Sequence, residues 1–120
     1  MLQIEYKTDK VKQQCISVKE ARKLFGGDMT LATNLHARIN ALKNAESLRD
    51  IIVLPRYRFH NLYGNLEGYF AIDVKTKKEP WRIILQPLDE SMQPYNPCNI
   101  DEISGIARIV KIMEVSKHYE

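Results

Sequence analysis

Apolar residues recur along this chain with two different periods, and the change of period separates a helical part from a strand-rich part. The segment LQIEY at residues 2–6 has apolar side chains at every second position, which predicts a half-buried strand. Residues 17–50 carry apolar side chains three and four positions apart, as on an amphipathic helix. From residue 57 the period of two returns. The pattern therefore predicts a first strand, a helical stretch and then a sheet.

Two helices are predicted in the helical stretch. The first, SVKEARKLFGG, has Ser17 as its N-cap, Glu20 three residues later and a pair of glycines as its stop signal. Asp28 can cap the second, over residues 29–50. Its apolar face consists of Leu31, Leu35, Ile39 and Leu42. Because the link is short, the two helices should form an αα-hairpin.

Four strands are predicted after the hairpin, at residues 57–62, 69–74, 81–86 and 106–115. The turns YGNLEG and KTKKEP separate the first three, which indicates an antiparallel meander. Residues 87–105 hold four acids and no basic residue, and they predict a long loop with a helical turn near residues 101–104. The expected fold class is α+β, as a single domain over residues 1–120: an N-terminal strand, an αα-hairpin and a twisted antiparallel sheet with a long loop before the last strand.

The formal net charge of +3 is unevenly distributed. Residues 1–86 carry 15 Lys and Arg against 9 Asp and Glu, whereas residues 87–120 carry 3 against 6. A basic body suits a polyanion such as RNA. No apolar run is long enough to span a membrane, and MLQIEYKTDKVKQQ has no signal-peptide core, so we expect a cytoplasmic protein. Cys15 and Cys98 lack metal-ligand spacing and are predicted to be free thiols.

The common catalytic and metal-binding motifs are absent from the sequence: there is no Ser-His-Asp, HExxH, phosphate-loop or zinc-knuckle pattern. The remaining candidates for chemistry are one histidine and two arginines. His60 shares a predicted strand face with Arg58, and Arg82 lies on a later strand of the same sheet. An imidazole can transfer a proton near neutral pH, and a guanidinium can bind phosphate oxygens. A strand histidine beside a structural ion pair would explain the same residues, so the local pattern leaves both interpretations open.

The residues after the last predicted strand, KHYE, can also donate protons, accept them or stack. Lys117, His118 and Tyr119 belong to this group. A frayed polar tail is the alternative explanation, since chain termini are commonly mobile.

The order of elements, together with RFHNLYGNLEGYFAIDV, EPWRIILQP and RIVKIMEVSKHYE, resembles the HigB-type killer toxins of the RelE/ParE superfamily. The resemblance covers nearly the whole chain and is most specific over residues 54–87. Members typically read H-x-L-K-G-[DN]-x-x-G-x-[FWY]-[SA]-[IV], followed by [WY]-R-[IL]. The matching residues are His60, Leu62, Gly64, Asn65, Gly68, Phe70, Ala71, Ile72, Trp81, Arg82 and Ile83.

This resemblance implies a type II toxin that cleaves messenger RNA in the ribosomal A site. In the family, the 2′-hydroxyl attacks the neighbouring phosphate without a metal ion or cofactor. His60 matches the first active-site histidine, and Arg82 matches the arginine that stabilises the phosphate charge. The implied partners are a helix-turn-helix antitoxin of the HigA type, the ribosome and messenger RNA, with operator DNA reached only through the antitoxin.

The chain departs from the family pattern at two places. Tyr63 replaces the usual lysine, so the positive charge could come from Arg82, Arg58 or Lys117, and Tyr63 itself keeps a hydroxyl and a stacking ring for RNA. The family's aspartate-tyrosine-histidine ending aligns in two registers, which place either Tyr119 or Glu120 at the histidine. Both His118 and Tyr119 fall in the implied site in either register.

Two other classes of protein remain open. One is a binding protein of the same fold that does not cut RNA, such as a gyrase inhibitor or an inactive toxin that acts as a co-repressor. The other is an unrelated α+β domain in which the motifs coincide by chance.

Overall fold

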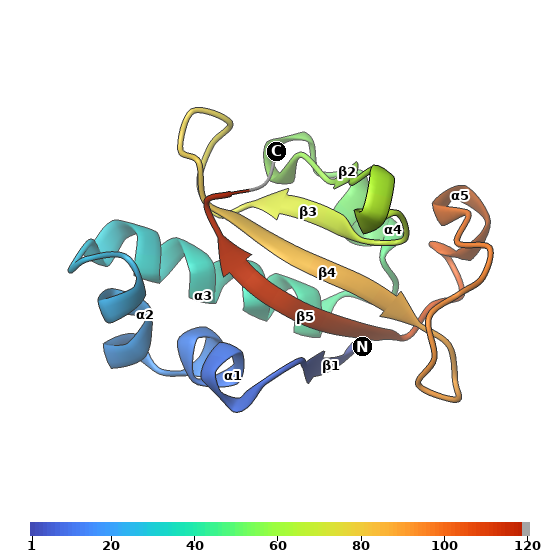
Figure 1. Ribbon diagram of the computed structural model, residues 1–120, viewed down its shortest axis with the longest axis horizontal. Helices are drawn as coiled ribbons and strands as arrows, with labels where there is room; N and C mark the ends of the chain where they lie inside the picture. Colours follow the sequence, from blue (N-terminus) through green and yellow to red (C-terminus); the bar gives the residue numbers. More distant parts are fainter. Residues whose placement is uncertain (119–120) are drawn as a thin grey trace.

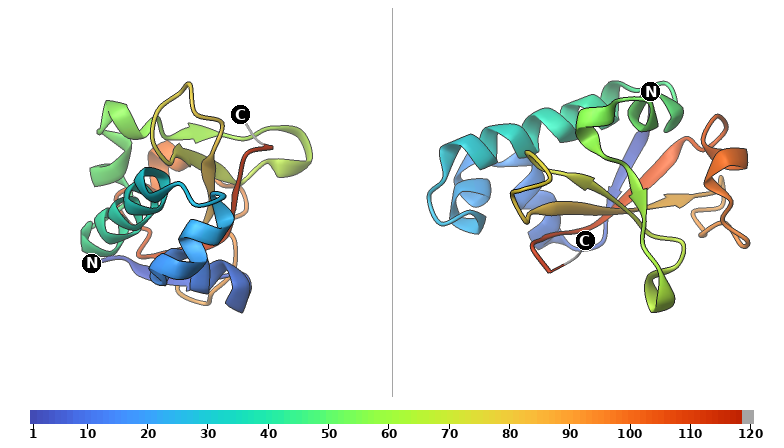
Figure 2. Two further views of the ribbon diagram at one scale, coloured as in Figure 1. Left: turned by 90° about the vertical axis from the view of Figure 1, so that its left-hand side faces the viewer. Right: turned by 90° about the horizontal axis from the view of Figure 1, so that it is seen from above.

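A computed structural model describes residues 1–118 and contains one five-stranded sheet with helices packed on one of its faces (Figures 1 and 2). The strands are β1 (Gln3–Tyr6), β2 (His60–Asn61), β3 (Phe70–Asp73), β4 (Arg82–Leu88) and β5 (Ile109–Ser116). The helices are α1 (Asp9–Ile16), α2 (Val18–Leu24), α3 (Met29–Asn44) and two single turns, α4 (Arg49–Ile52) and α5 (Ile100–Ile103). Two 3₁₀ turns are η1 (Pro55–Tyr57) and η2 (Gly64–Leu66).

The strands lie in the order β1-β5-β4-β3-β2. Strands β2 to β5 pair antiparallel in sequence order, which confirms the predicted meander. Strand β1 pairs parallel with β5, so the first and last strands lie side by side and the sheet is mixed. The α+β class with an N-terminal strand is therefore confirmed, whereas the parallel pairing could not be predicted from the local pattern.

The predicted αα-hairpin is α2 and α3. The Ser17 hydroxyl accepts a hydrogen bond from the backbone N–H of Glu20 at 3.3 Å, and the Asp28 carboxylate accepts one from Leu31 at 3.1 Å. Gly26 and Gly27 have φ angles of +62° and +95°, which other residues rarely adopt, and this pair turns the chain between the helices.

Helix α1 was not predicted, and the second helix of the hairpin is shorter than predicted. Helix α1 buries only Val11 and Cys15, a stripe too thin to give a clear helical pattern. Helix α3 ends at Asn44 instead of continuing to residue 50, because the chain becomes extended at Ala45 before the separate turn of α4.

The strand predicted at residues 57–62 contains only His60 and Asn61. Pro55 starts a 3₁₀ turn, and Arg58 at its end has a left-handed φ of 48°. Polar and apolar residues do not separate cleanly in this segment because most of it is not part of a sheet. Two further predictions are confirmed: η2 forms the YGNLEG turn, and α5 is the helical turn in the long loop.

The two faces of the sheet differ in what covers them. The main core lies between the sheet and α3, where Leu35, Ile39 and Leu42 are almost fully buried. We call the opposite surface the open face. One row of it crosses four strands in the order His60, Ala71, Ile84 and Glu114, and the next row holds Asp73, Arg82 and Ser116.

None of the helices within residues 1–118 combines the length and the apolar content that a membrane crossing requires.

Candidate functional site

The candidate site is built around Asp73, a carboxylate at the end of β3 that is only 1% exposed. Its Oδ1 and Oδ2 atoms lie 3.2 and 3.0 Å from Arg58 Nε, which donates to both. Oδ1 also lies 3.1 Å from Arg82 Nε, but that N–H is not aligned for a hydrogen bond, so the contact is an ion pair. One buried carboxylate therefore holds two guanidinium groups, and we call these three residues the Asp73 cluster.

Arg82 is almost completely buried. Its Nη1 donates to the carbonyl oxygens of Glu79 and Trp81, and its Nη2 donates to that of Lys77 at 3.0 Å. The loop between β3 and β4 thus wraps around the guanidinium, and the side chain is 5% exposed. This placement differs from the expectation of a substrate-facing arginine: Arg82 lies directly opposite Asp73 in the sheet, and the sequence does not display that pairing.

Arg58 occupies the outer side of the Asp73 cluster, with its side chain 32% exposed. Its backbone carbonyl oxygen lies 2.6 Å from His60 Nδ1. A carbonyl can only accept, so Nδ1 carries the hydrogen and Nε2 carries the lone pair when the ring is neutral. The structure thus brings Arg58 and His60 together and fixes the tautomer of the neutral ring, with the hydrogen on Nδ1.

Helix α3 anchors the same corner of the sheet through Arg38. Arg38 Nε donates to the carbonyl oxygen of Asp73 at 3.0 Å, and Nη2 donates to that of Lys75 at 3.3 Å. The guanidinium also lies 4.0 Å from the centre of the Tyr57 ring, the residue that precedes Arg58. The backbone on both sides of the Asp73 cluster is therefore fixed to a helix of the core.

The end of β5 lies beside the Asp73 cluster because Ser116 is paired with Arg82. Lys117 and His118 follow, and both are exposed. The Lys117 ammonium lies 5.8 Å from the centre of the Trp81 ring, and the His118 backbone N–H donates to Ser116 Oγ at 3.1 Å. Tyr119, the remaining predicted site residue, lies outside the described residues.

Tyr63 lies apart from the Asp73 cluster. Its side chain is 78% exposed, and it lines a cavity of about 300 Å³ between the β2–β3 hairpin and residues 98–101. These residues belong to the loop between β4 and β5, which we call the acidic loop. The structure therefore places Tyr63 next to the acidic loop.

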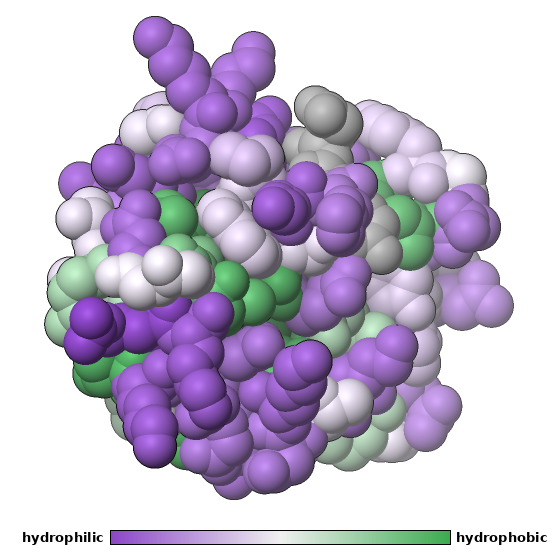
Figure 3. All heavy atoms as spheres, turned by 60° about the vertical axis from the view of Figure 1, so that its left-hand side comes forward, coloured by the Kyte–Doolittle hydropathy of each residue, from purple (hydrophilic) through white to green (hydrophobic). Residues whose placement is uncertain are grey.

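The exposed residues around the Asp73 cluster are mainly basic. Lys75, Lys77 and Lys78 are exposed in the loop that wraps Arg82, and Lys117 faces the same loop from β5. The surface at this end of the molecule is largely hydrophilic (Figure 3). The acidic loop follows the opposite end of β4 (Figure 1), so the two charges are separated along that strand.

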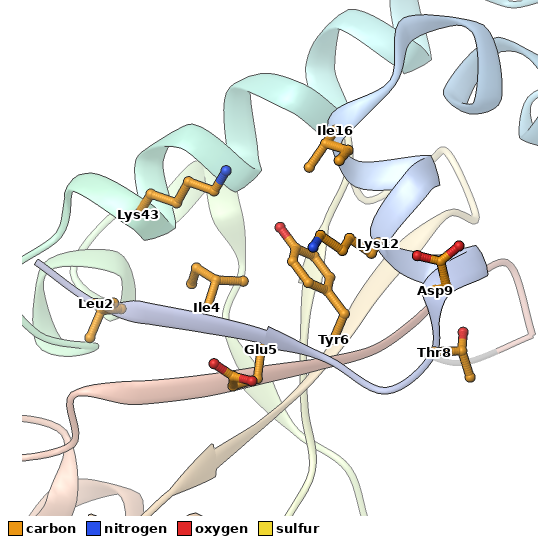
Figure 4. A pocket seen from close by; sticks show the side chains of 9 residues that line it. All are labelled: Leu2, Ile4, Glu5, Tyr6, Thr8, Asp9, Lys12, Ile16 and Lys43. Carbon is orange, nitrogen blue, oxygen red and sulfur yellow. The ribbon is translucent and has the colours of Figure 1, made fainter.

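A larger cavity, of about 640 Å³, lies between β1, α1 and α3 at the opposite edge of the sheet from His60 (Figure 4). Tyr6 points into it from β1 and Lys43 extends toward it from α3. Within residues 1–118, no group of three or more His, Cys, Asp and Glu side chains is arranged to hold a metal ion.

Asp73 is the site residue that sequence reasoning missed. A signal was present: Asp73 is the one acid in the apolar segment YFAIDV, and the period of two puts it on the same face as Ala71. An acid in a central strand requires a cationic partner, and the candidates were the two arginines already under consideration.

Comparison with known protein families gives no match, and no curated protein matches the chain either. Among solved structures, the chain is similar to the crystal structure of YafQ from E. coli strain BL21(DE3). The superposition has a TM-score of 0.51 and covers 98% of this chain and 94% of YafQ. The fold is RelE-like. The sequences are 14% identical, so the similarity to YafQ establishes the fold alone.

Proposed function

We propose that this chain is the toxin of a type II toxin–antitoxin system and that it cuts messenger RNA in the ribosomal A site without a metal ion. The observation that carries the proposal is the placement of His60 beside the Arg58 guanidinium on the open face of a RelE-like sheet. The motif resemblance over residues 54–87 supports the same histidine independently of the contacts.

The proposed reaction is a transesterification within the RNA. The 2′-hydroxyl oxygen attacks the adjacent phosphorus, its proton passes to a base, and the bond from phosphorus to the 5′-oxygen breaks. The leaving oxygen takes a proton from an acid, which gives a 2′,3′-cyclic phosphate and a 5′-hydroxyl. The chain must supply a base, an acid and a cation for the charged phosphorane.

In the proposal, His60 supplies the base and Arg58 supplies the cation. The Nε2 atom of neutral His60 is the proton acceptor, and the exposed side of the Arg58 guanidinium stabilises the phosphorane charge. Arg82 acts as a positioning residue, because it holds the Asp73 carboxylate that in turn orients Arg58.

The residues after β5 supply the remaining chemistry in the proposal. His118 or Tyr119 donates the proton to the leaving oxygen, and Lys117 binds the RNA backbone. Tyr63 lies at the hairpin tip and is proposed to stack on an RNA base farther from the cut.

The proposed setting follows from the same resemblance. The toxin acts in the cytoplasm on the ribosome and messenger RNA, and a HigA-type helix-turn-helix antitoxin neutralises it. Contact with operator DNA is proposed to occur only through that antitoxin.

The proposal is tested by incubating purified protein with translating ribosomes and mapping the ends of the messenger RNA. We expect cuts in the A site that end in a 2′,3′-cyclic phosphate. His60→Ala should slow cleavage by about 10²- to 10⁴-fold, the usual contribution of one acid–base group. Arg58→Ala should slow it by about 10²- to 10³-fold, as expected for one electrostatic contact to the transition state.

Matched controls are His36→Ala on α3 and Arg22→Ala on α2, which change the same residue types outside the Asp73 cluster. Both should keep the parental rate. Cleavage that is unaffected by His60→Ala would refute the assigned base, and absence of any cut by folded parent protein would refute the proposed activity.

A second function, a binding protein of the same fold that does not cut RNA, is favoured by one observation. Arg82, which matches the family's phosphate-stabilising arginine, has its guanidinium occupied by Asp73 and three carbonyl oxygens. Growth arrest with intact messenger RNA and induced DNA damage would indicate a gyrase inhibitor. Absence of growth arrest would indicate an inactive toxin that acts as a co-repressor.

A further inference from the structure

A third cavity, which we call the hollow, lies on the open face, close to His60. Its volume is about 170 Å³, which is small beside the roughly 300–1,000 Å³ of pockets for drug-sized ligands. Its walls come from β4, β5, the turn that carries η2 and the residue directly after β1. The lining residues are Lys7, Leu66, Tyr69, Ile84, Met113 and Glu114.

Strand register fixes where this hollow lies relative to the candidate site. Ile84 in its floor belongs to the row that also contains His60 and Glu114. Two strand spacings separate the Cα atoms of His60 and Ile84, a distance of about 10 Å. One RNA strand lying across the open face can therefore present a phosphate to His60 and a nearby base to the hollow.

The walls of the hollow suit the flat, apolar faces of a nucleobase. Leu66, Ile84 and Met113 are aliphatic, and the half-buried Tyr69 contributes an aromatic ring. Stacking between an aromatic side chain and an unpaired base is a common mode of RNA recognition.

Two charged residues at the hollow give it polarity. Within residues 1–118, neither Glu114 nor Lys7 forms an ion pair, and the Glu114 carboxylate accepts no side-chain hydrogen bond. The register of β4 and β5 shifts between Ile84 and Leu85, which inserts Met113 as an extra residue next to Glu114. Such a bulge re-aims side chains, and here both Met113 and Glu114 line the hollow.

We propose that this hollow binds a guanine of the RNA segment that His60 cuts, and that Glu114 reads its Watson–Crick edge. Guanine presents two adjacent donors there, N1–H and the N2 amino group, which match the two oxygens of a carboxylate. Adenine and cytosine present a donor beside an acceptor that repels the carboxylate, and uracil presents one donor between two carbonyl oxygens. Lys7 can bind a neighbouring phosphate. This inference rests on the proposed function for its RNA substrate.

The first test maps the bases around each cut for the parent, Glu114→Gln and the control Glu90→Gln. Glu90 is an exposed acid near the far end of β4, so the control makes the same chemical change outside the hollow. The parent should favour guanine at one fixed position by roughly tenfold over the other bases, the usual range for a good bidentate contact. Glu114→Gln should abolish that ratio, and Glu90→Gln should preserve it.

The second test measures binding without cleavage. The parent is titrated with GMP, AMP, CMP and UMP while its amide signals are followed by NMR. In the parent, GMP should bind most tightly and shift the signals of Lys7, Tyr69 and Glu114. The Glu114→Gln variant should lose the preference for GMP. The Tyr69→Leu variant should bind all four nucleotides more weakly.

The two tests separate failure of the hollow from failure of the proposed function. If the parent cuts RNA and Glu114→Gln leaves its base preference unchanged, the hollow does not read guanine. If the parent cuts no RNA, the proposed cleavage fails and the titration alone tests the hollow. A preference for GMP that depends on Glu114 would then support guanine binding in the hollow. Equal binding of all four nucleotides would refute it.

Discussion

At the scale of single residues, Asp73 determines the geometry of the candidate site. Its carboxylate lies between the guanidinium groups of Arg58 and Arg82 and is nearly excluded from water. Removing it would leave the buried Arg82 without its ion-pair partner and the partly exposed Arg58 without the group that orients it. Substitution of Asp73 should therefore affect both the stability of the fold and the position of Arg58.

Asp73→Ala is expected to lower the free energy of unfolding by about 3–5 kcal/mol, as when one partner of a buried ion pair is removed. Urea denaturation followed by circular dichroism measures this change. Glu90→Ala, which removes an exposed acid, should stay within about 0.5 kcal/mol of the parent. A loss for Asp73→Ala as small as that of the control would mean that the buried ion pairs do not stabilise the protein.

At the scale of elements, the packing of α1 against the sheet and α3 encloses the thiol of Cys15, which is 3% exposed. Burial raises the pKa of the Cys15 thiol to about 12, and the nearby Lys43 ammonium lowers it only in part. Burial also raises the pKa of the half-buried Cys98 thiol, in the acidic loop. The reactivity of Cys15 therefore reports whether α1 remains packed.

At pH 8, iodoacetamide should modify Cys98 while Cys15 remains unmodified until the protein unfolds, and mass spectrometry can count the adducts. Above the ordinary thiol pKa of 9.0, the unfolded state loses the Cys15 proton while the folded state keeps it. The contribution of Cys15 to stability should therefore fall as the pH rises from 9 toward 12. The Cys15→Ala variant should not show this fall. Equal labelling of both thiols in the folded protein would show that α1 opens readily.

At the scale of the whole molecule, charge is separated along β4. Exposed lysines lie in the loop before the strand, and the acidic loop follows it (Figure 1). An RNA strand is attracted to the basic end, and the acidic end disfavours phosphate. This distribution should orient RNA across the open face toward His60 and Arg58.

Replacement of Lys77 and Lys78 by serine is expected to weaken binding of short single-stranded RNA and to reduce its salt dependence. Loss of two phosphate contacts should reduce the slope of log K against log salt by about 1.4, measured by fluorescence anisotropy between about 50 and 200 mM salt. Replacement of Lys10 and Lys19 on α1 and α2 removes the same charge from the helical side and should leave the slope unchanged. Equal effects of both double substitutions would show that RNA binding is not directed to the basic end.

The sequence by itself determined the elements whose signals are local. The caps at Ser17 and Asp28, the glycine pair between the helices and the period-two strands each depend on residues only a few positions apart. The meander followed because its turns are short. The grouping of His60 and Arg58 was also predictable, since the two residues are close in the chain.

Only the tertiary structure decided which groups carry the charge at the candidate site. Three features depend on residues that are far apart in sequence or lie on different strands. They are the pairing of β1 with β5, the burial of Arg82 and the ion pairs of Asp73. A register shift of one residue would move each of these side chains to the other face of the sheet. Local patterns constrain which residues form a strand, but the packing of the whole sheet sets its register. The register places Arg82 opposite Asp73 and Glu114 beside the hollow.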